Sequence, residues 1–256
     1  MPAGRMGAVG AKPASPSGPP VLGSAVATWW ADDLATADGG SVTSWVDRIH
    51  GKTLSTLNAA PVMRRTGGAN SKPTIEFNGS TQAFEMTEAN ALSTALQGCV
   101  VVVGQVTTPT NGNTIWCTAD VGSGFRYLLG TCRVSGGELE VQQRNNDTKN
   151  LVHGSTSVGS ATYRLMEWSS SGTAYAHRLD NAAQTMTVRG GSNTGNWFGD
   201  TSARDNFTLG ALHYSSVISY NAMKVSLVMV ADAELSSGDR AALKAWVADY
   251  YALTLS

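Results

Sequence analysis

The sequence predicts an all-β fold of two stacked sheets, closed by one C-terminal helix and preceded by an extended N-terminal arm. Three observations predict it: strand-like runs follow one another from residue 25, the last residues show helical periodicity, and the first 24 residues are rich in proline. About a dozen short strands cannot form one flat sheet, so we expect a sandwich or jelly roll. At 256 residues the chain can hold one large domain, expected over residues 25–256.

Residues 1–24 form the predicted arm. They contain five of the eight prolines and have no acidic or aromatic residue. Such a segment cannot bury enough apolar surface to fold alone, and in extended form it would reach about 70 Å. We expect it to anchor the domain to a neighbouring subunit, with a loose tail as the alternative. The anchoring residues are predicted to be Arg5, Lys12, Pro13, Pro16, Pro19 and Pro20.

The strands that follow are short and separated by residues that favour turns. Gly, Asn, Asp, Ser or Pro bounds each apolar run. The unbroken apolar run at residues 99–103 predicts a central strand that is buried on both faces. The predicted strands cover residues 26–30, 42–46, 74–77, 83–86, 99–106, 114–117, 125–129, 139–142, 163–168, 174–178, 186–188, 207–212 and 223–230.

A helix is predicted over residues 236–252. Ser236 and Asp239 have the spacing of a capping box at its start. Because the rest of the domain has strand signals, the apolar side of this helix is expected to lie against a sheet. That side is formed by Leu243, Trp246, Val247, Tyr250 and Tyr251, which repeat at helical intervals.

Composition excludes several partners. The net charge is -1, with 18 basic and 19 acidic residues mixed along the chain, so neither nucleic acid nor an anionic membrane is an expected partner. No apolar run is long enough to span a membrane, and residues 1–23 lack the apolar core of a secretory leader. Charged residues make up only 14% of the chain, which is typical of extracellular or particle-exposed β-proteins.

Three cysteines, Cys99, Cys117 and Cys132, lie in or beside predicted strands. A buried thiol behaves as a small apolar side chain, so three buried free thiols are expected rather than a disulfide and one odd cysteine. Their wide spacing, and four histidines without motif spacing, give no support for a metal site.

Several motifs follow one another in a characteristic order. They are TWWADDL at 28–34, GGSV at 39–42, WVD at 45–47, KPTIEFNG at 72–79, and LG at 209–210 before the last strand and helix. This order resembles the concanavalin A-like, laminin-G-like jelly rolls, in particular those of tailed-bacteriophage virion proteins. The resemblance spans roughly residues 25–256. It implies a jelly-roll fold, which by itself hosts many functions.

The resemblance implies a non-catalytic structural protein on the virion surface, as a capsid decoration or head-fibre protein. Phage capsid or tail subunits would be its partners, and a symmetric homo-oligomer is expected. Adhesion to cell-surface glycans is an additional hypothesis. No cofactor is expected. The alternatives are a carbohydrate-binding receptor module of a phage tail or fibre, and a polysaccharide hydrolase.

The hydrolase alternative depends on acidic residues along one strand. Glycoside-cleaving relatives carry E-x-D/E-x-x-E, and the nearest match here is ELEVQQ at 138–143. Glu138 and Glu140 would share a face of the strand, but Gln143 stands at the third acidic position. A retaining hydrolase needs a second carboxyl group as proton donor, so an ordinary strand with two glutamates is favoured.

A glycan site is predicted in the loop at residues 190–200. An exposed aromatic ring can stack on a sugar while amide and carboxylate groups bond its hydroxyls. The alternative is that the tryptophan folds back and plugs the end of the sandwich. The predicted site residues are Trp197, Phe198, Asn193, Asn196 and Asp200.

A second polar loop, Asn145-Asn146-Asp147, could supply oxygen ligands to Ca²⁺. Calcium takes six to eight oxygens, and three on one turn fall short of that number. Calcium is therefore an unsupported option, and no metal site is predicted.

Overall fold

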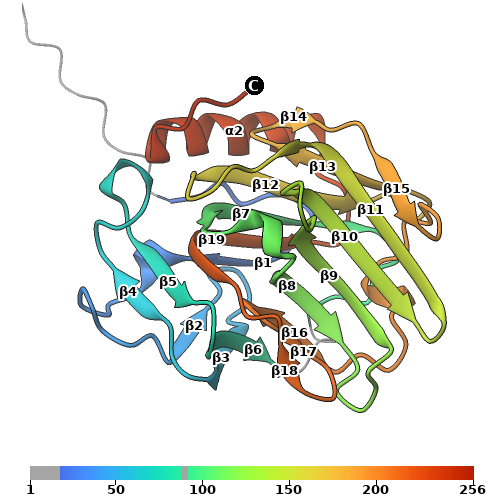
Figure 1. The fold of residues 1–256 in the computed structure, drawn as a ribbon. Coiled ribbons are helices and arrows are strands. Elements are labelled where there is room, and N and C mark those ends of the chain that lie inside the picture. The colour runs from blue at the N-terminus through green and yellow to red at the C-terminus, as the bar shows by residue number, and fades with distance from the viewer. Residues whose placement is uncertain (1–17, 88–91) are drawn as a thin grey trace, which may run out of the picture.

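The computed structural model describes residues 18–87 and 92–256. Within these residues two antiparallel sheets stack on each other, and α2 (Ser237–Tyr251) lies along the outer side of one of them (Figure 1). The predicted two-sheet sandwich with one C-terminal helix is confirmed. No helix in this described part is long and apolar enough to cross a membrane.

The first sheet has eight strands, and β7 lies at its centre between β12 and β19. The predicted central strand is confirmed, because residues 99–103 within β7 are buried. β1 and β5 share one edge of β19, pairing with its second and first halves respectively. In sheet order the strands are β14 (Ala182–Ala183), β13 (Tyr175–Leu179), β12 (Arg164–Ser170), β7 (Gly98–Val106), β19 (Ala222–Ala231), β5 (Thr74–Asn78) and β4 (Val62–Arg64), with β1 (Ala25–Trp30) beside β19.

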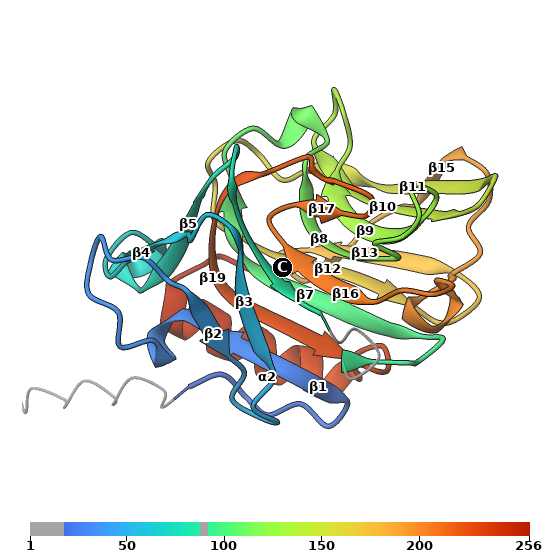
Figure 2. The same cartoon turned by 90° about the horizontal axis from the view of Figure 1, so that it is seen from below.

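The second sheet has nine strands, and a separate hairpin of β17 (Leu212–His213) and β18 (Val217–Ile218) follows it in the chain. Figure 2 shows β17 next to β8, in agreement with their close contact. In sheet order the strands are β15 (Thr187–Gly190), β11 (Thr148–Ser157), β10 (Glu138–Asn145), β9 (Arg126–Cys132), β8 (Thr114–Ala119), β16 (Asn206–Leu209), β6 (Gln82–Met86), β3 (Thr53–Asn58) and β2 (Ser44–Val46).

The main core lies between the two sheets. It contains Trp29, Trp45, Trp116, Trp168 and Trp197, all of them fully buried. Burying a large apolar side chain contributes roughly 1.5–3 kcal/mol, so these tryptophans contribute much of what holds the sheets together. The three cysteines are buried and free, as predicted.

The C-terminal helix starts and packs as its sequence predicts. The Ser236 side chain accepts a hydrogen bond from the backbone N–H of Asp239 at 3.0 Å, which caps the helix. Trp246, Tyr250 and Tyr251 pack with Trp30 on the outer side of the eight-stranded sheet. The helix ends one residue before the predicted boundary, at Tyr251.

Four short 3-10 helices connect the strands in the described residues: Ala31–Asp33, Ala69–Ser71, Pro109–Asn111 and Phe198–Asp200.

Candidate functional site

One sheet face in this sandwich is left largely open. The inner sides of both sheets pack against each other, and α2 covers the outer side of the eight-stranded sheet. The outer side of the nine-stranded sheet carries only a short hairpin, β17–β18, among the elements that the structure describes. We call this side the open face, and it is formed by outward side chains of β3, β6, β16, β8, β9, β10 and β11.

The β17–β18 hairpin divides the open face. On one side His213 Nδ1 lies 2.6 Å from Glu85 Oε1 on β6. On the other side Leu212 packs with Tyr127 and Leu129 of β9, and the Tyr214 ring stacks on the Tyr127 ring at 6.3 Å. The hairpin therefore forms a ridge, with one hollow toward β3 and β6 and another toward β9 and β10.

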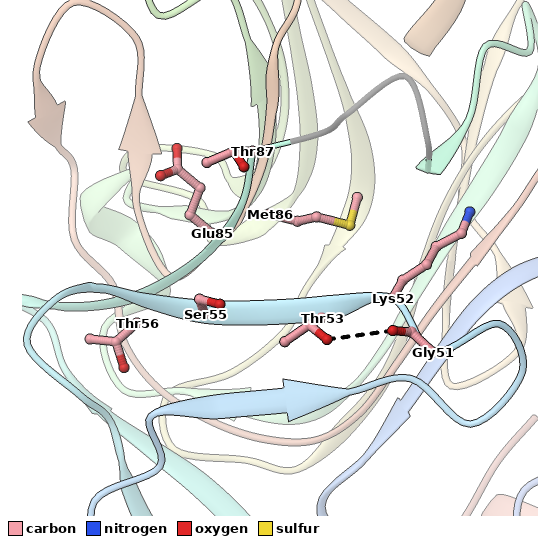
Figure 3. Close-up of a pocket in the computed structure, with 8 residues that line it drawn as sticks. All are labelled: Gly51, Lys52, Thr53, Ser55, Thr56, Glu85, Met86 and Thr87. Atoms are coloured by element: carbon pink, nitrogen blue, oxygen red, sulfur yellow. Dashed lines mark hydrogen bonds between the residues drawn. The ribbon is translucent and has the colours of Figure 1, made fainter.

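The first hollow, which we call the β3–β6 hollow, has a volume of about 410 Å³. Figure 3 shows Lys52 at one end of it, with Glu85 and Thr87 above the β3 strand. Ser55 lies directly opposite Glu85 in the sheet, so both side chains share the open face. The hollow is lined by Gly51, Lys52, Thr53, Ser55, Thr56, Glu85, Met86 and Thr87.

A tight turn before β3 positions Lys52. The buried Asp47 carboxylate accepts hydrogen bonds from the backbone N–H groups of Ile49 at 2.8 Å and Lys52 at 2.6 Å. Asp47 thus caps this turn, as its sequence position indicates. Partial burial lowers the pKa of Lys52, while the nearby Asp47 charge opposes that shift. The Lys52 ammonium donates to the Leu92 carbonyl at 3.1 Å.

Polar side chains hold Glu85 in place at the foot of the ridge. Its Oε1 atom accepts from Asn206 Nδ2 at 3.1 Å, and the same amide donates to the His213 carbonyl at 2.8 Å. Asn206 is itself fixed, because its Oδ1 accepts from the Ala119 backbone at 2.9 Å. The hollow therefore offers a fixed carboxylate beside hydroxyl groups and an ammonium group, a set that bonds polyhydroxylated ligands well.

The second hollow, which we call the tyrosine hollow, has a volume of about 210 Å³. Tyr127 faces Arg144 across β9 and β10, and Leu129 faces Gln142 in the next outward row. Its lining residues are Gly112, Thr114, Gly124, Tyr127, Leu129, Gln142, Arg144, Leu212, Tyr214, Ile218 and Ser219. It combines aromatic rings with a guanidinium and an amide group.

The structure buries the two aromatic residues of the predicted glycan site, while Asn193, Asn196 and Asp200 are partly exposed. Trp197 and Phe198 are fully buried in the main core and stack on each other at 5.3 Å. The prediction of an exposed ring at Trp197 is therefore wrong, and the alternative, a plug at the end of the sandwich, is what the structure shows. The physical reason is that Trp197 packs against Trp116, which buries far more apolar area than an exposed ring would.

The polar residues of the same loop hold this plug in place. Asp200 accepts from the backbone N–H of Trp197 at 2.8 Å, and Asn193 accepts from the backbone N–H of Tyr175 at 2.6 Å. The Asn196 carbonyl accepts from the Tyr175 hydroxyl at 2.5 Å. These side chains and carbonyls close the sandwich end, so the loop serves packing in this structure.

The two glutamates of β10 are held by arginines. Glu140 is fully buried at its side chain and is bonded by Arg189 at 2.9 and 3.0 Å. Glu138 is bonded by Arg133 at 2.7 and 3.0 Å, and this hydrogen bonding lowers the pKa of Glu138. A proton donor needs the opposite shift. Gln143 points into the buried interior, where Asn150 donates to it at 2.9 Å.

The described residues contain no group of three or more His, Cys, Asp or Glu side chains that could hold a metal ion. In the polar turn after β10, Asn146 Oδ1 already accepts from Arg126 at 3.2 Å. The calcium option rests on the sequence alone.

The arm is described only at its root. Pro19 and Pro20 line a third hollow of about 350 Å³, together with Thr28 and Arg48. The other predicted anchoring residues, Arg5, Lys12, Pro13 and Pro16, lie outside the described residues.

No protein-family model and no curated protein sequence matches this chain. Solved structures do resemble it. Domain 4 of AbnA, a GH43 extracellular arabinanase from Geobacillus stearothermophilus, in complex with arabinotriose, has a TM-score of 0.64 at 10% identity, covering 88% of this chain and 100% of that chain. The CBM40 of the Ruminococcus gnavus IT-sialidase, bound to α2,3 sialyllactose, has a TM-score of 0.54 at 14% identity, covering 66% and 92%.

The likeness shows the fold. This chain is a jelly-roll sandwich, as predicted. The NanB sialidase of Streptococcus pneumoniae also resembles it, with a TM-score of 0.53 at 14% identity over 72% of this chain. The match covers only 27% of the sialidase chain, so it concerns one part of that protein.

Sequence reasoning missed the open face. The polar residues of the β3–β6 hollow come from strands that are far apart in the chain, and no motif marks them. One usable signal was the run Gly124-Phe125-Arg126-Tyr127, in which aromatic residues directly follow a glycine turn. Phe125 is 54% exposed, whereas an aromatic residue of the core would be buried.

Proposed function

We propose that this chain is a non-catalytic carbohydrate-binding domain that holds a glycan on its open face. The observation that carries the proposal is the open, polar-lined β3–β6 hollow beside the hairpin ridge, on the one sheet face that α2 and the other sheet leave uncovered. Two structures of similar fold are described as bound to sugars, sialyllactose and arabinotriose. That similarity supports the proposal without identifying the sugar.

The chemistry of the hollow fits sugar hydroxyl groups. Glu85 accepts hydrogen bonds, while Thr53, Ser55 and Thr87 can each donate and accept. Glu85 is already oriented by Asn206, so little side-chain freedom is lost on binding. Binding rather than hydrolysis is proposed because both β10 glutamates are paired with arginines, and hydrogen bonding to Arg133 lowers the pKa of Glu138, whereas a proton donor needs a raised pKa.

The test is a glycan array probed with the full chain, followed by titration of the best glycan. Ser55→Trp fills the β3–β6 hollow from an exposed position on β3, and Glu85→Gln removes its carboxylate charge. Both variants should weaken binding by about tenfold or more, since each removes or blocks charge-assisted hydrogen bonds. Ala245→Trp, at an exposed position of α2, is the matched control and should bind normally.

Two results would count against the proposal. The first is the absence of binding to any polysaccharide on the array. The second is a glycan affinity that neither Ser55→Trp nor substitutions in the tyrosine hollow reduce, because the open face would then not be the site.

The virion role stays a prediction from the sequence resemblance. A carbohydrate-binding domain on a phage tail or fibre would be consistent with that resemblance and would use the open face as its binding surface. We propose in the same sense that the chain is located on a virion surface, that phage subunits are its partners and that it forms a homo-oligomer.

A further inference from the structure

Beside the ridge, one aromatic and two basic side chains form an outward-facing row across three strands. Arg144 on β10 faces Tyr127 on β9 and Lys149 on β11. Residues directly opposite each other in antiparallel strands share a sheet face. Arg144 and Lys149 therefore project from neighbouring positions on the open face, and Arg144 lines the tyrosine hollow.

Among the described residues, neither of these two cations forms an ion pair with a carboxylate. Across residues 18–87 and 92–256, the eight ion pairs involve other basic residues. Arg144 donates from Nε to the Asn146 carbonyl at 3.2 Å and lies over the Phe125 ring at 4.3 Å. Like charges directly opposite in a sheet are destabilising, and an anion bound between them would offset that cost.

Aromatic and amide groups complete the surroundings. The partly exposed Tyr214 ring covers the buried Tyr127 ring, and Phe125 is exposed beside Arg144. Gln142 lies one outward position along β10, where its amide donates to Glu140 at 2.7 Å. Aromatic rings suit the apolar face of a sugar, and the planar guanidinium of arginine suits a carboxylate or phosphate group. At about 210 Å³, the hollow is smaller than the roughly 300–1,000 Å³ of sites for drug-sized ligands, which suits one sugar ring.

The two hollows differ in charge. Lys52 and Glu85 give the β3–β6 hollow one charge of each sign, whereas Arg144 is the one charged residue among those that line the tyrosine hollow. We propose that the tyrosine hollow binds an anionic sugar residue, with Arg144 and Lys149 receiving its negative charge. This proposal rests on the carbohydrate-binding function proposed above and names the class of glycan: one with acidic residues.

The test measures dissociation constants of the full chain for three sugars by NMR titration at constant ionic strength. The sugars are glucuronate, glucose 6-phosphate and glucose, so that a carboxylate, a phosphate and a neutral ring are compared. We expect at least one anionic sugar to bind about tenfold or more tightly than glucose, with shift changes around Arg144 and Tyr127. The affinity for the anionic sugar should fall when the titration is repeated at higher salt.

Arg144→Gln should remove this preference, with a loss of about tenfold. Lys149→Gln, at an exposed position, should weaken anion binding about two- to fivefold. Lys244→Gln on α2 removes one charge on the other side of the sandwich and is the matched control. If Arg144→Gln fails to fold, Lys149→Glu reverses the charge at the exposed position and should abolish the preference.

Two outcomes would overturn the inference. If glucose binds as tightly as both anionic sugars, or if the anion preference survives Arg144→Gln and Lys149→Glu, the tyrosine hollow is not an anion site. In either case, binding of a neutral glycan that Ser55→Trp weakens would still support the proposed function. If no glycan of any kind binds, both proposals fall together.

Discussion

Acidification should destabilise this protein through one buried histidine. His177 on β13 is 1% exposed, and burial lowers its pKa to about 4. Its Nδ1 lies 2.9 Å from the Ala176 carbonyl and its Nε2 lies 3.3 Å from the Val152 carbonyl. Both contacts favour the charged ring, so the lowered pKa means that desolvation outweighs them.

The direction follows from comparing the folded and unfolded states. In the unfolded chain the ring takes up a proton below about pH 6.5, whereas in the folded protein it stays neutral until about pH 4. The stability that the neutral ring contributes is therefore lost as the pH falls through this window. The linkage relation gives a loss of about 2 kcal/mol between pH 7 and pH 5, and about 3 kcal/mol by pH 4.

The assay is urea unfolding followed by tryptophan fluorescence at pH 7, 6 and 5. His177→Gln removes the titrating ring, so its free energy of unfolding should fall by about 2 kcal/mol less than that of the unmodified protein over this range. His50→Gln, at an exposed position, is the control and should keep the original pH dependence. If the His177→Gln and unmodified curves run parallel from pH 7 to pH 5, the reasoning about the buried ring is wrong.

Three further substitutions test the packing by urea unfolding. Ala252 ends α2 in the left-handed region at φ 52°, so Ala252→Gly should stabilise the protein by about 0.5–1 kcal/mol, and a loss would contradict this account. A methyl group on Gly130 would lie 2.1 Å from Trp116 Nε1, so Gly130→Ala should cost about 1–3 kcal/mol; an unchanged midpoint would show that the indole moves freely. Arg189→Gln leaves the buried Glu140 without its cation and should lower the free energy of unfolding by about 2–4 kcal/mol. This loss is smaller than that for a fully buried pair, because the Arg189 side chain is 41% exposed. The double variant Glu140→Gln, Arg189→Gln should recover part of that loss.

Elements whose signals are local could be predicted from the sequence. The helix cap depends on Ser236 and Asp239, three residues apart, and the central strand depends on one continuous apolar run at residues 99–103. Each signal lies within a few residues of the element that it marks, and the packing agrees with it. The fold class could therefore be predicted from such signals alone.

The candidate site could not be predicted, because it depends on strand register and on the β17–β18 hairpin, which lies far along the chain from the strands that it covers. Tyr127, Arg144 and Lys149 meet only through the pairing of β9, β10 and β11. A shift of one residue in that register would turn each side chain to the other face. The polar neighbours of Trp197 in the sequence suggested an exposed loop. In the fold its ring lies in the core, where Trp116 packs against it.

The hairpin ridge explains why the open face was hard to recognise. An uncovered sheet face is expected to alternate between apolar inward and polar outward residues, yet Tyr127, Leu129 and Cys117 point outward and are buried. They are buried because Leu212 and Tyr214 cover them from the hairpin. The outward apolar positions that break the alternation thus mark where the ridge sits. The same ridge forms one wall of the tyrosine hollow and, through His213, fixes the carboxylate at the edge of the β3–β6 hollow.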